Sequence, residues 1–196
     1  MKDIGGLKLN QPNNGNLILN VGCGGSLRYP FTSGTLGEVS KDSFTVHMDL
    51  KIDQPKQVFF GHNVVRADGQ ILPFRAKVFH RVYASHILEH CLFPPQALKE
   101  WGRVSREFVD IRVPDKVYQS NQEQNDHLYT WTQHSLENLL KIFFVHVEVT
   151  TNFRISLGRR VLDALRLHAW VRYNRLISKG ELKALAFGFR GRISDD

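Results

Sequence analysis

Short apolar runs, several of them stopped by a glycine or an aspartate, are the feature that most constrains the fold of this chain. The first run, Leu17–Val21, stops at Gly22, and brief uninterrupted runs of this kind are typical of buried parallel strands. Five further strands are predicted along the chain, at Phe44–Met48, Asn63–Ala67, Val78–Ala84, Phe108–Val113 and Val145–Val149.

Helical patterns alternate with these strands. Pro94 and Pro95 suit a first helical turn, and Thr132 suits an N-cap position. Helices are therefore predicted at Ser85–Leu92, Gln96–Val104 and Thr132–Phe143, and Leu182–Phe189 has the pattern of one more strand. This alternation favours an α/β fold in which a mostly parallel sheet of about seven strands has helices on both faces.

The length of 196 residues fits one domain, 1–196, with a sizeable core. Only two cysteines are present, far apart in sequence, so no disulfide framework is predicted. No apolar stretch approaches the ~18 residues needed to cross a bilayer, and the first residues do not resemble a secretory signal. These features predict a cytoplasmic location.

Three consecutive strands are followed by residues suited to a nucleoside ligand. Gly22 follows the first strand, where a residue without a side chain lets the backbone approach a ligand. Asp49 ends the second strand, where a carboxylate can accept hydrogen bonds from both hydroxyls of a ribose. Asp68 ends the third strand and could accept from the exocyclic amine of adenine. Because ligands of open parallel sheets bind at the carboxyl ends of the strands, this order predicts a nucleoside site.

These strand ends resemble the motifs of Rossmann-like (class I) S-adenosylmethionine-dependent methyltransferases. The segment Asn20–Gly24 resembles the first motif of that family, Val46–Leu50 the acidic second, Ala67–Phe74 the third and Val82–His90 the fourth. The later stretches Trp131-Thr132 and Ser135–Leu140 are similar to the subfamily that acts on small metabolites and glycans. The resemblance covers about residues 17–150 and implies that the chain is a methyltransferase with S-adenosylmethionine as its cofactor.

The resemblance also implies roles for individual residues. It places Asn20, Gly22, Cys23 and Gly24 beside the methionine portion of the cofactor, Asp49 and Leu50 at its ribose, Asp68 and Gly69 at its adenine, and Ser85 and His86 beneath the sulfonium. Two positions depart from the family pattern. Asn20 stands where an acidic residue is common, and Ser26 occupies the place of a third glycine.

A general base is needed only when the methyl acceptor is a hydroxyl or another protonated group. The candidates are His86, which follows the fourth strand, and His127, which lies in the polar loop after the fifth. A structural or surface role is the alternative for each histidine.

Other enzyme classes were weighed against this interpretation. His86–His90 fits the His-x-x-Glu-His pattern of some zinc proteases, but it follows a strand of the nucleoside arrangement and no third ligand is evident, so no metal site is predicted. The dinucleotide fingerprint is incomplete, because Leu27 stands where its last glycine belongs, and the phosphate-binding loop of nucleotide hydrolases is absent. A non-catalytic protein that binds S-adenosylmethionine stays an alternative.

The basic charge is concentrated near the end of the chain. The 26 Lys and Arg exceed the 19 Asp and Glu by seven, and residues 154–196 hold ten basic against four acidic residues. In the methyltransferase fold the last strand is antiparallel, so residues 151–180 are predicted to be a helical basic insertion near the active site.

This insertion predicts an anionic small-molecule, glycan or lipid-linked acceptor. RNA or DNA is the alternative partner, and residues 159–177 suggest contact with a membrane surface. The oligomeric state is left open.

Overall fold

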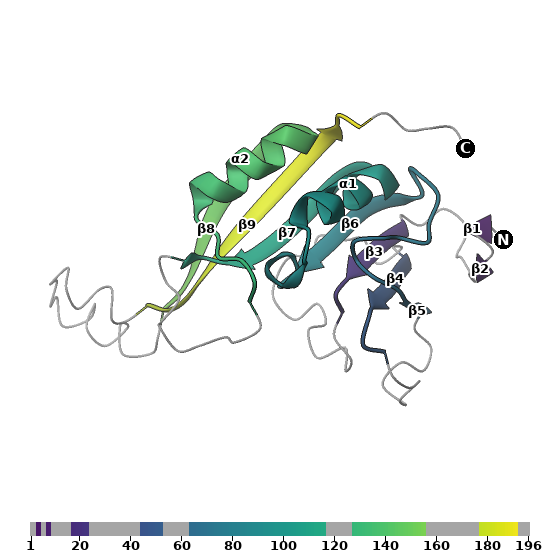
Figure 1. Cartoon of the computed structure of the whole chain (residues 1–196), viewed down its shortest axis with the longest axis horizontal. Helices are drawn as coiled ribbons and strands as arrows, with labels where there is room; N and C mark the ends of the chain where they lie inside the picture. Colours follow the sequence, from purple (N-terminus) through teal and green to yellow (C-terminus); the bar gives the residue numbers. More distant parts are fainter. Residues whose placement is uncertain are drawn as a thin grey trace, which may run out of the picture.

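The structure, a computed structural model, describes residues 3–4, 7–8, 17–23, 44–52, 63–116, 127–155 and 177–191. Its main feature is a seven-stranded sheet with the strand order β5-β4-β3-β6-β7-β9-β8 (Figure 1). The strands are β3 (Leu17–Val21), β4 (Phe44–Asp49), β5 (Asn63–Arg66), β6 (Phe79–Ser85), β7 (Ser105–Pro114), β8 (Phe144–Ile155) and β9 (Ile177–Phe189). Two short strands that the sequence did not predict, β1 (Asp3–Ile4) and β2 (Leu7–Lys8), form a separate antiparallel pair.

The half of the sheet from β5 to β7 is parallel. Val21 is opposite Met48 and Asp49 is opposite Arg66, so β3, β4 and β5 all end at one edge. From β3 the chain builds outward to β4 and β5, and β6 then returns to the other side of β3. The strand order therefore reverses between β3 and β6, which is where ligands of open α/β sheets bind.

The other half of the sheet contains the predicted antiparallel strand. β9 lies between β7 and β8 and is antiparallel to both, with Pro114 opposite Glu181 and Ile155 opposite Ile177. The connection from β8 to β9 therefore leaves and re-enters the sheet at the carboxyl edge of β7. Both strands are longer than predicted, because their mutual pairing continues beyond the end of β7 and satisfies the backbone there. Residues 151–155 and 177–180 are thus strand and not helical insertion, and residues 156–176 lie outside the described part.

Two helices, α1 (Pro94–Val104) and α2 (Gln133–Phe143), pack against each other on one face of the sheet (Figure 1). The predicted proline start of α1 is confirmed. So is the Thr132 cap of α2: its hydroxyl accepts the Ser135 N–H, and the Ser135 hydroxyl accepts the Thr132 N–H in return. The prediction of helices on the second face concerns segments outside the described residues.

The apolar core lies between the sheet and these two helices. Alternate strand positions face it, and the largest fully buried side chains include Trp101, Phe79, Met48 and Leu140. The intervening strand positions are more polar, with Asn20, His47, Asp110 and Arg112 all nearly buried. None of the helices that the structure describes has the length and apolar character needed to span a membrane.

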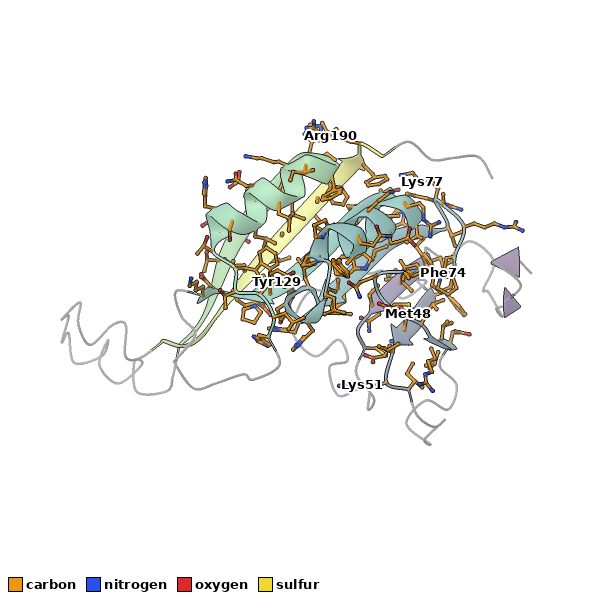
Figure 2. The ribbon with its side chains drawn as sticks, in the orientation of Figure 1. Met48, Lys51, Phe74, Lys77, Tyr129 and Arg190 are labelled. Carbon is orange, nitrogen blue, oxygen red and sulfur yellow. The ribbon has the colours of Figure 1, made fainter. Side chains whose placement is uncertain are left out.

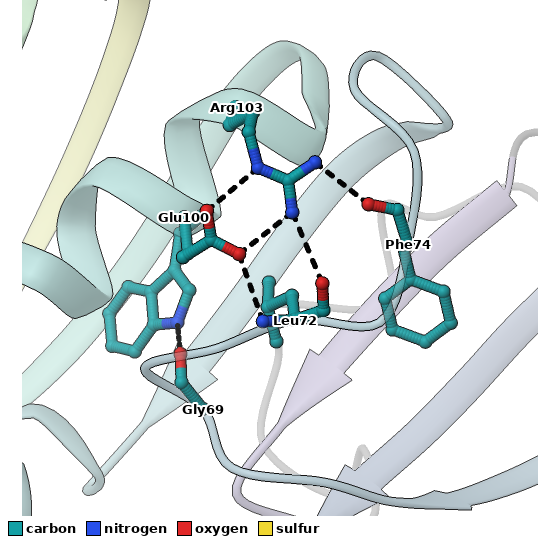
Figure 3. Close-up of polar contacts among 6 residues, drawn as sticks. Gly69, Leu72, Phe74, Glu100 and Arg103 are labelled. Atoms are coloured by element: carbon teal, nitrogen blue, oxygen red, sulfur yellow. Dashed lines mark hydrogen bonds and ion pairs between the residues drawn. The ribbon is translucent and has the colours of Figure 1, made fainter. Parts of the chain in front are cut away.

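A charged pair on α1 holds the loop that follows β5 (Figure 3). Glu100 accepts two hydrogen bonds from the Arg103 guanidinium, both 2.7 Å long, and also accepts the Leu72 N–H at 2.9 Å. Arg103 in turn donates to the backbone carbonyls of Leu72 and Phe74, and the Trp101 indole donates to the carbonyl of Gly69. These bonds fix the loop that carries Asp68 and Gly69, so α1 sets the position of one side of the predicted site.

Replacing Glu100 by glutamine tests whether this charged pair, the clamp of Glu100 and Arg103, holds the loop after β5. Partial burial acts to raise the pKa of Glu100, but the hydrogen bond and charge of Arg103 outweigh it and lower the pKa. A carboxyl with a lowered pKa stabilises the fold above its unfolded pKa, and that contribution is lost as the pH falls. We expect Glu100→Gln to reduce the free energy of unfolding by about 1–3 kcal/mol at pH 7. Urea titrations followed by circular dichroism measure the free energy of unfolding. The difference in this free energy between the variant and the original chain should shrink below about pH 4.5.

A matched control is Glu137→Gln, which removes an exposed carboxylate paired with Lys141 four residues along α2. Exposed pairs of this kind add little stability, so this variant should unfold at nearly the same urea concentration as the original chain. Equal effects of the two substitutions at pH 7, or a Glu100 effect that does not change with pH, would contradict the clamp.

Candidate functional site

The turn after β3 is held against the end of β4 by two backbone hydrogen bonds. The N–H groups of Gly22 and Cys23 both donate to the Met48 carbonyl, at 2.8 and 3.1 Å. Gly22 has a φ of +71°, a conformation that favours glycine. A Cβ atom at this position would lie 2.7 Å from Ile87 Cδ1 and 2.9 Å from Ile87 Cβ. The chain therefore needs a glycine here for its backbone conformation and for the close approach of Ile87.

Ile87, which the sequence analysis did not single out, joins the first and third motifs. Its side chain lies next to Gly22, and a Cβ atom on Gly69 would be 3.3 Å from the same Ile87 Cδ1 atom. The turns after β3, β5 and β6 therefore meet around one isoleucine. This contact could not be predicted from the sequence, because it depends on the loop conformation after β6. The apolar pattern of that segment had suggested a helix.

The two predicted carboxylates follow neighbouring strands and are oriented by local hydrogen bonds. Asp49 Oδ1 accepts the Lys51 N–H at 2.8 Å, and Asp68 Oδ1 accepts the Gln70 N–H at 2.9 Å. Met48 and Lys51, labelled in Figure 2, bracket Asp49 at the end of β4. Leu50, the other residue predicted at the ribose, is 56% exposed. Both carboxylates thus lie at the edge where β3, β4 and β5 end.

Two further residues of the first motif, Asn20 and Cys23, are buried in the structure. Asn20 is nearly buried, and its Nδ2 atom lies 3.2 Å from Nδ1 of His47 on β4. Cys23 is buried, and burial together with the Asp49 carboxylate raises the pKa of its thiol to about 12, so it is no nucleophile at neutral pH. Gly24, also predicted beside the cofactor, lies outside the described residues.

The segment after β6 is not the predicted helix. Ser85 ends β6 opposite Arg112, and His86 has a φ of +53°, in the left-handed region. The His86 N–H donates to the Arg112 carbonyl at 2.9 Å, which keeps this residue on the sheet and prevents a helical turn from starting at Ser85. Only Leu88–His90 (η2) forms a 3-10 turn. The helical His-x-x-Glu-His arrangement of the zinc-protease alternative is therefore absent from this segment.

His86 bridges two carboxylates at this edge. Its Nε2 atom lies 3.0 Å from Glu181 Oε1 on β9, and its Nδ1 atom lies 3.4 Å from Glu89 Oε1. Burial alone would lower the pKa of His86, but the hydrogen bonds and charges of Glu181 and Glu89 outweigh it and raise the pKa to about 9. The imidazole is then protonated at neutral pH, which favours a hydrogen-bond donor over a general base. Glu181, which also lies 3.6 Å from the Arg112 guanidinium, was not predicted because only the antiparallel strand brings it here.

His127, the second predicted base, is held next to the same turn. The Leu128 and Tyr129 N–H groups donate to the backbone carbonyl of Glu89, and the Tyr129 hydroxyl donates to the Leu92 carbonyl. The His127 Nε2 atom lies 4.0 Å from Glu89 Oε1. The two candidate bases, 41 residues apart in sequence, therefore flank one buried carboxylate.

Comparison with known proteins bears on the domain and on the fold. Residues 19–107 match the family model described as a methyltransferase domain. Among solved structures, the fold is similar to an S-adenosylmethionine-dependent methyltransferase from Archaeoglobus fulgidus, with a TM-score of 0.60 and 16% identity over 88% of this chain and 86% of that one. A counterpart from Aquifex aeolicus gives a TM-score of 0.51 and 11% identity over 87% and 82% of the two chains. No curated protein sequence matches the chain.

The same fold also occurs in the [4+2]-cyclase SpnF, which matches with a TM-score of 0.54 and 12% identity over 89% of this chain and 75% of that one. Likeness of fold therefore does not by itself define a reaction. Residues 19–107 thus match a methyltransferase domain, and the chain has the Rossmann-like, class I methyltransferase fold. The residues fit S-adenosylmethionine as a cofactor: Gly22 turns the backbone sharply at the end of β3, and two carboxylates stand at adjacent strand ends.

We expect Gly22→Ala to destabilise the chain by about 1–3 kcal/mol, because an L side chain strains the positive φ and its Cβ would overlap Ile87. The Ile87 Cβ atom cannot move without its backbone, so the turn must shift and S-adenosylmethionine binding should be lost. Gln96→Ala, at an exposed position of α1, is the control and should keep both stability and affinity. Urea unfolding and calorimetric titration check both variants, and a Gly22→Ala protein with original stability and affinity would contradict the geometry.

Proposed function

We propose that the carboxyl edge of β3, β4 and β5 binds S-adenosylmethionine through Gly22, Asp49 and Asp68. The bound cofactor supplies a methyl group that its sulfonium has already activated. Asp49 would accept hydrogen bonds from the ribose hydroxyls, and Asp68 with Gly69 would border the adenine. The support is the shared edge of the strands, together with the hydrogen bonds that orient each carboxylate.

Asp49→Asn should weaken cofactor binding while the fold remains intact. Hydrogen bonds to a charged partner contribute about 1.5–3 kcal/mol, so the dissociation constant should rise roughly 10- to 100-fold. The Lys51 N–H can still donate to the asparagine oxygen, which preserves the turn. Titration calorimetry with S-adenosylhomocysteine measures the change, and Glu148→Gln on the exposed part of β8 is the control. Equal affinities of the Asp49→Asn and Glu148→Gln proteins would exclude Asp49 from the site.

We further propose that the methyl acceptor is an anionic small molecule, glycan or lipid-linked molecule. The observation that carries this proposal is the β8–β9 connection, which leaves and re-enters the sheet at the carboxyl edge of β7. Its sequence, residues 156–176, contains five arginines and a single acidic residue, Asp163. Guanidinium groups suit carboxylates and phosphates.

The chain's part in the reaction is to align the acceptor with the methyl group. A new bond forms between the acceptor atom and the methyl carbon as the carbon–sulfur bond breaks, and the electron pair of that bond stays on sulfur as a neutral thioether. A hydroxyl acceptor also loses a proton. Both ring nitrogens of His86 face carboxylates, so its proposed role is to hold the turn after β6 at this edge, and His127 stays the candidate that assists deprotonation.

Incubation with S-adenosylmethionine labelled in its methyl group tests the acceptor class. The chain is mixed with fractionated cell extract, and the label is followed through anion exchange before and after nuclease digestion. We expect label in a nuclease-resistant fraction that the anion exchanger retains, and none with the Asp49→Asn chain. Label that flows through the exchanger would overturn the anionic acceptor, and label released by nuclease would establish the nucleic-acid alternative. Flotation with anionic vesicles then separates a lipid-linked from a soluble product.

A further inference from the structure

A carboxylate and two imidazoles gather beside the turn after β6. One ligand atom from each of Glu89, His90 and His127 lies within 4.8 Å of the others. The His90 and His127 rings meet edge to face, with their centroids 4.7 Å apart. The cluster combines two consecutive residues of one turn with a third residue from a loop 37 positions later in the chain. His86 is not a member, because its Nε2 atom is bonded to Glu181.

Glu89 gives independent support for a bound cation. Its side chain is completely buried, and within the described residues Oε1 makes only long contacts to imidazoles, with His86 Nδ1 at 3.4 Å and His127 Nε2 at 4.0 Å. Oε2 has no hydrogen-bond partner in that part of the chain. Buried charges are ordinarily paired or coordinate metals, and contacts this long offset little of the cost of burial. A cation among these three residues would satisfy the carboxylate.

The backbone holds the ligands in place without any ion. The Glu89 carbonyl accepts the N–H groups of both Leu128 and Tyr129, at 2.9 and 3.2 Å. The Tyr129 hydroxyl donates to the Leu92 carbonyl, and its ring stacks on Trp131, which is itself buried. These contacts fix the loop of His127 to the turn of Glu89 and His90. A site whose ligands come from two tied segments loses little conformational entropy when a metal binds.

The donor set indicates which kind of ion fits. Two imidazole nitrogens and one carboxylate oxygen are ligands that zinc and neighbouring transition metals share, whereas magnesium and calcium prefer oxygen alone. In a tetrahedral zinc site the ligand atoms lie roughly 2.0–2.2 Å from the ion and therefore about 3.3–3.6 Å from one another. The three ligand atoms here lie within 4.8 Å of one another, so side-chain shifts of about 1 Å would bring them to that spacing. Three protein ligands also leave a coordination position open.

We propose that Glu89, His90 and His127 bind one divalent transition-metal ion, with zinc as the ion that best suits the ligands. The site follows His86 by three residues, beside the edge at which we propose that the acceptor approaches, and its open position would take an oxygen or carboxylate of the acceptor. This acceptor role rests on the proposed function and takes the place of His127 as a base, since the ring nitrogen that binds a metal no longer accepts a proton; metal binding itself does not depend on that function. No metal was predicted from the sequence because His127, the third ligand, is distant in the chain.

The experiment uses the full chain after removal of metals with a chelator. Cobalt(II) is titrated as a spectroscopic probe, zinc binding is measured by competition, and bound metal is counted by elemental analysis. We expect one equivalent of either ion, with a cobalt absorption band typical of mixed nitrogen and oxygen ligands. His90→Ala, His127→Ala and the nearly isosteric Glu89→Gln should each weaken binding at least tenfold. His134→Ala, which removes an exposed histidine of α2, is the matched control and should leave the affinity unchanged.

Two results would overturn the metal site: an original chain that binds neither ion, or binding that His90→Ala and His127→Ala leave unchanged. Circular dichroism of each variant shows whether it folds, and the result for the original chain decides the question even if a variant does not fold. Titration of S-adenosylhomocysteine into the metal-free chain separates this proposal from the proposed function. If the chain binds metal but no nucleoside, only the proposed function is contradicted. If it binds nucleoside but no metal, only the metal site is contradicted.

Discussion

The Met48 carbonyl, which accepts the N–H groups of Gly22 and Cys23, joins the end of β4 to the turn after β3. With these two bonds in place, Gly22 must adopt a positive φ, and Ile87 packs where a side chain at Gly22 would otherwise lie. Gly69 meets the same isoleucine, while Trp101, Glu100 and Arg103 hold its loop from the helix side. The edge at which we propose nucleoside binding is thus fixed by backbone contacts, and its carboxylates depend on that framework for their positions.

The charged residues of the site depend on the other half of the sheet. Glu181 reaches His86 only because β9 runs antiparallel between β7 and β8. The same strand brings Glu181 to Arg112, a nearly buried residue on β7. Since methyl transfer requires mainly alignment and a suitable local charge, we propose that β9 supplies the features by which this fold selects an acceptor. The similar fold of a [4+2]-cyclase shows that the fold alone does not define the reaction.

The strands and the two long helices could be predicted because each is defined locally. Leu17–Val21 is a buried apolar run, and Thr132 caps α2 through hydrogen bonds within four residues. The segment after β6 could not, because its apolar spacing fits a helix while the His86 N–H is bound to the sheet at Arg112. Tertiary contacts overrode the local preference there. The lengths of β8 and β9 likewise depend on their pairing with each other.

Asp49 and Asp68 could be proposed from sequence because strand ends of a parallel sheet share an edge. Ile87, Glu181 and the grouping of Glu89 with His127 could not, since each depends on a contact between segments that no local pattern relates. Glu89 carried a weak signal in the His-x-x-Glu-His pattern. That pattern suggested a metal with His86 as a ligand, whereas the structure groups Glu89 and His90 with His127 and turns His86 toward Glu181.

The central claim is that the ends of β3, β4 and β5 form one nucleoside site. A crystal structure of the chain with S-adenosylhomocysteine tests it most directly. We expect the ribose hydroxyls within hydrogen-bond distance of Asp49, the adenine beside Asp68 and Gly69, and the amino-acid portion over the Gly22 turn. A ligand bound elsewhere, or one in the same region with neither carboxylate in contact, would contradict it.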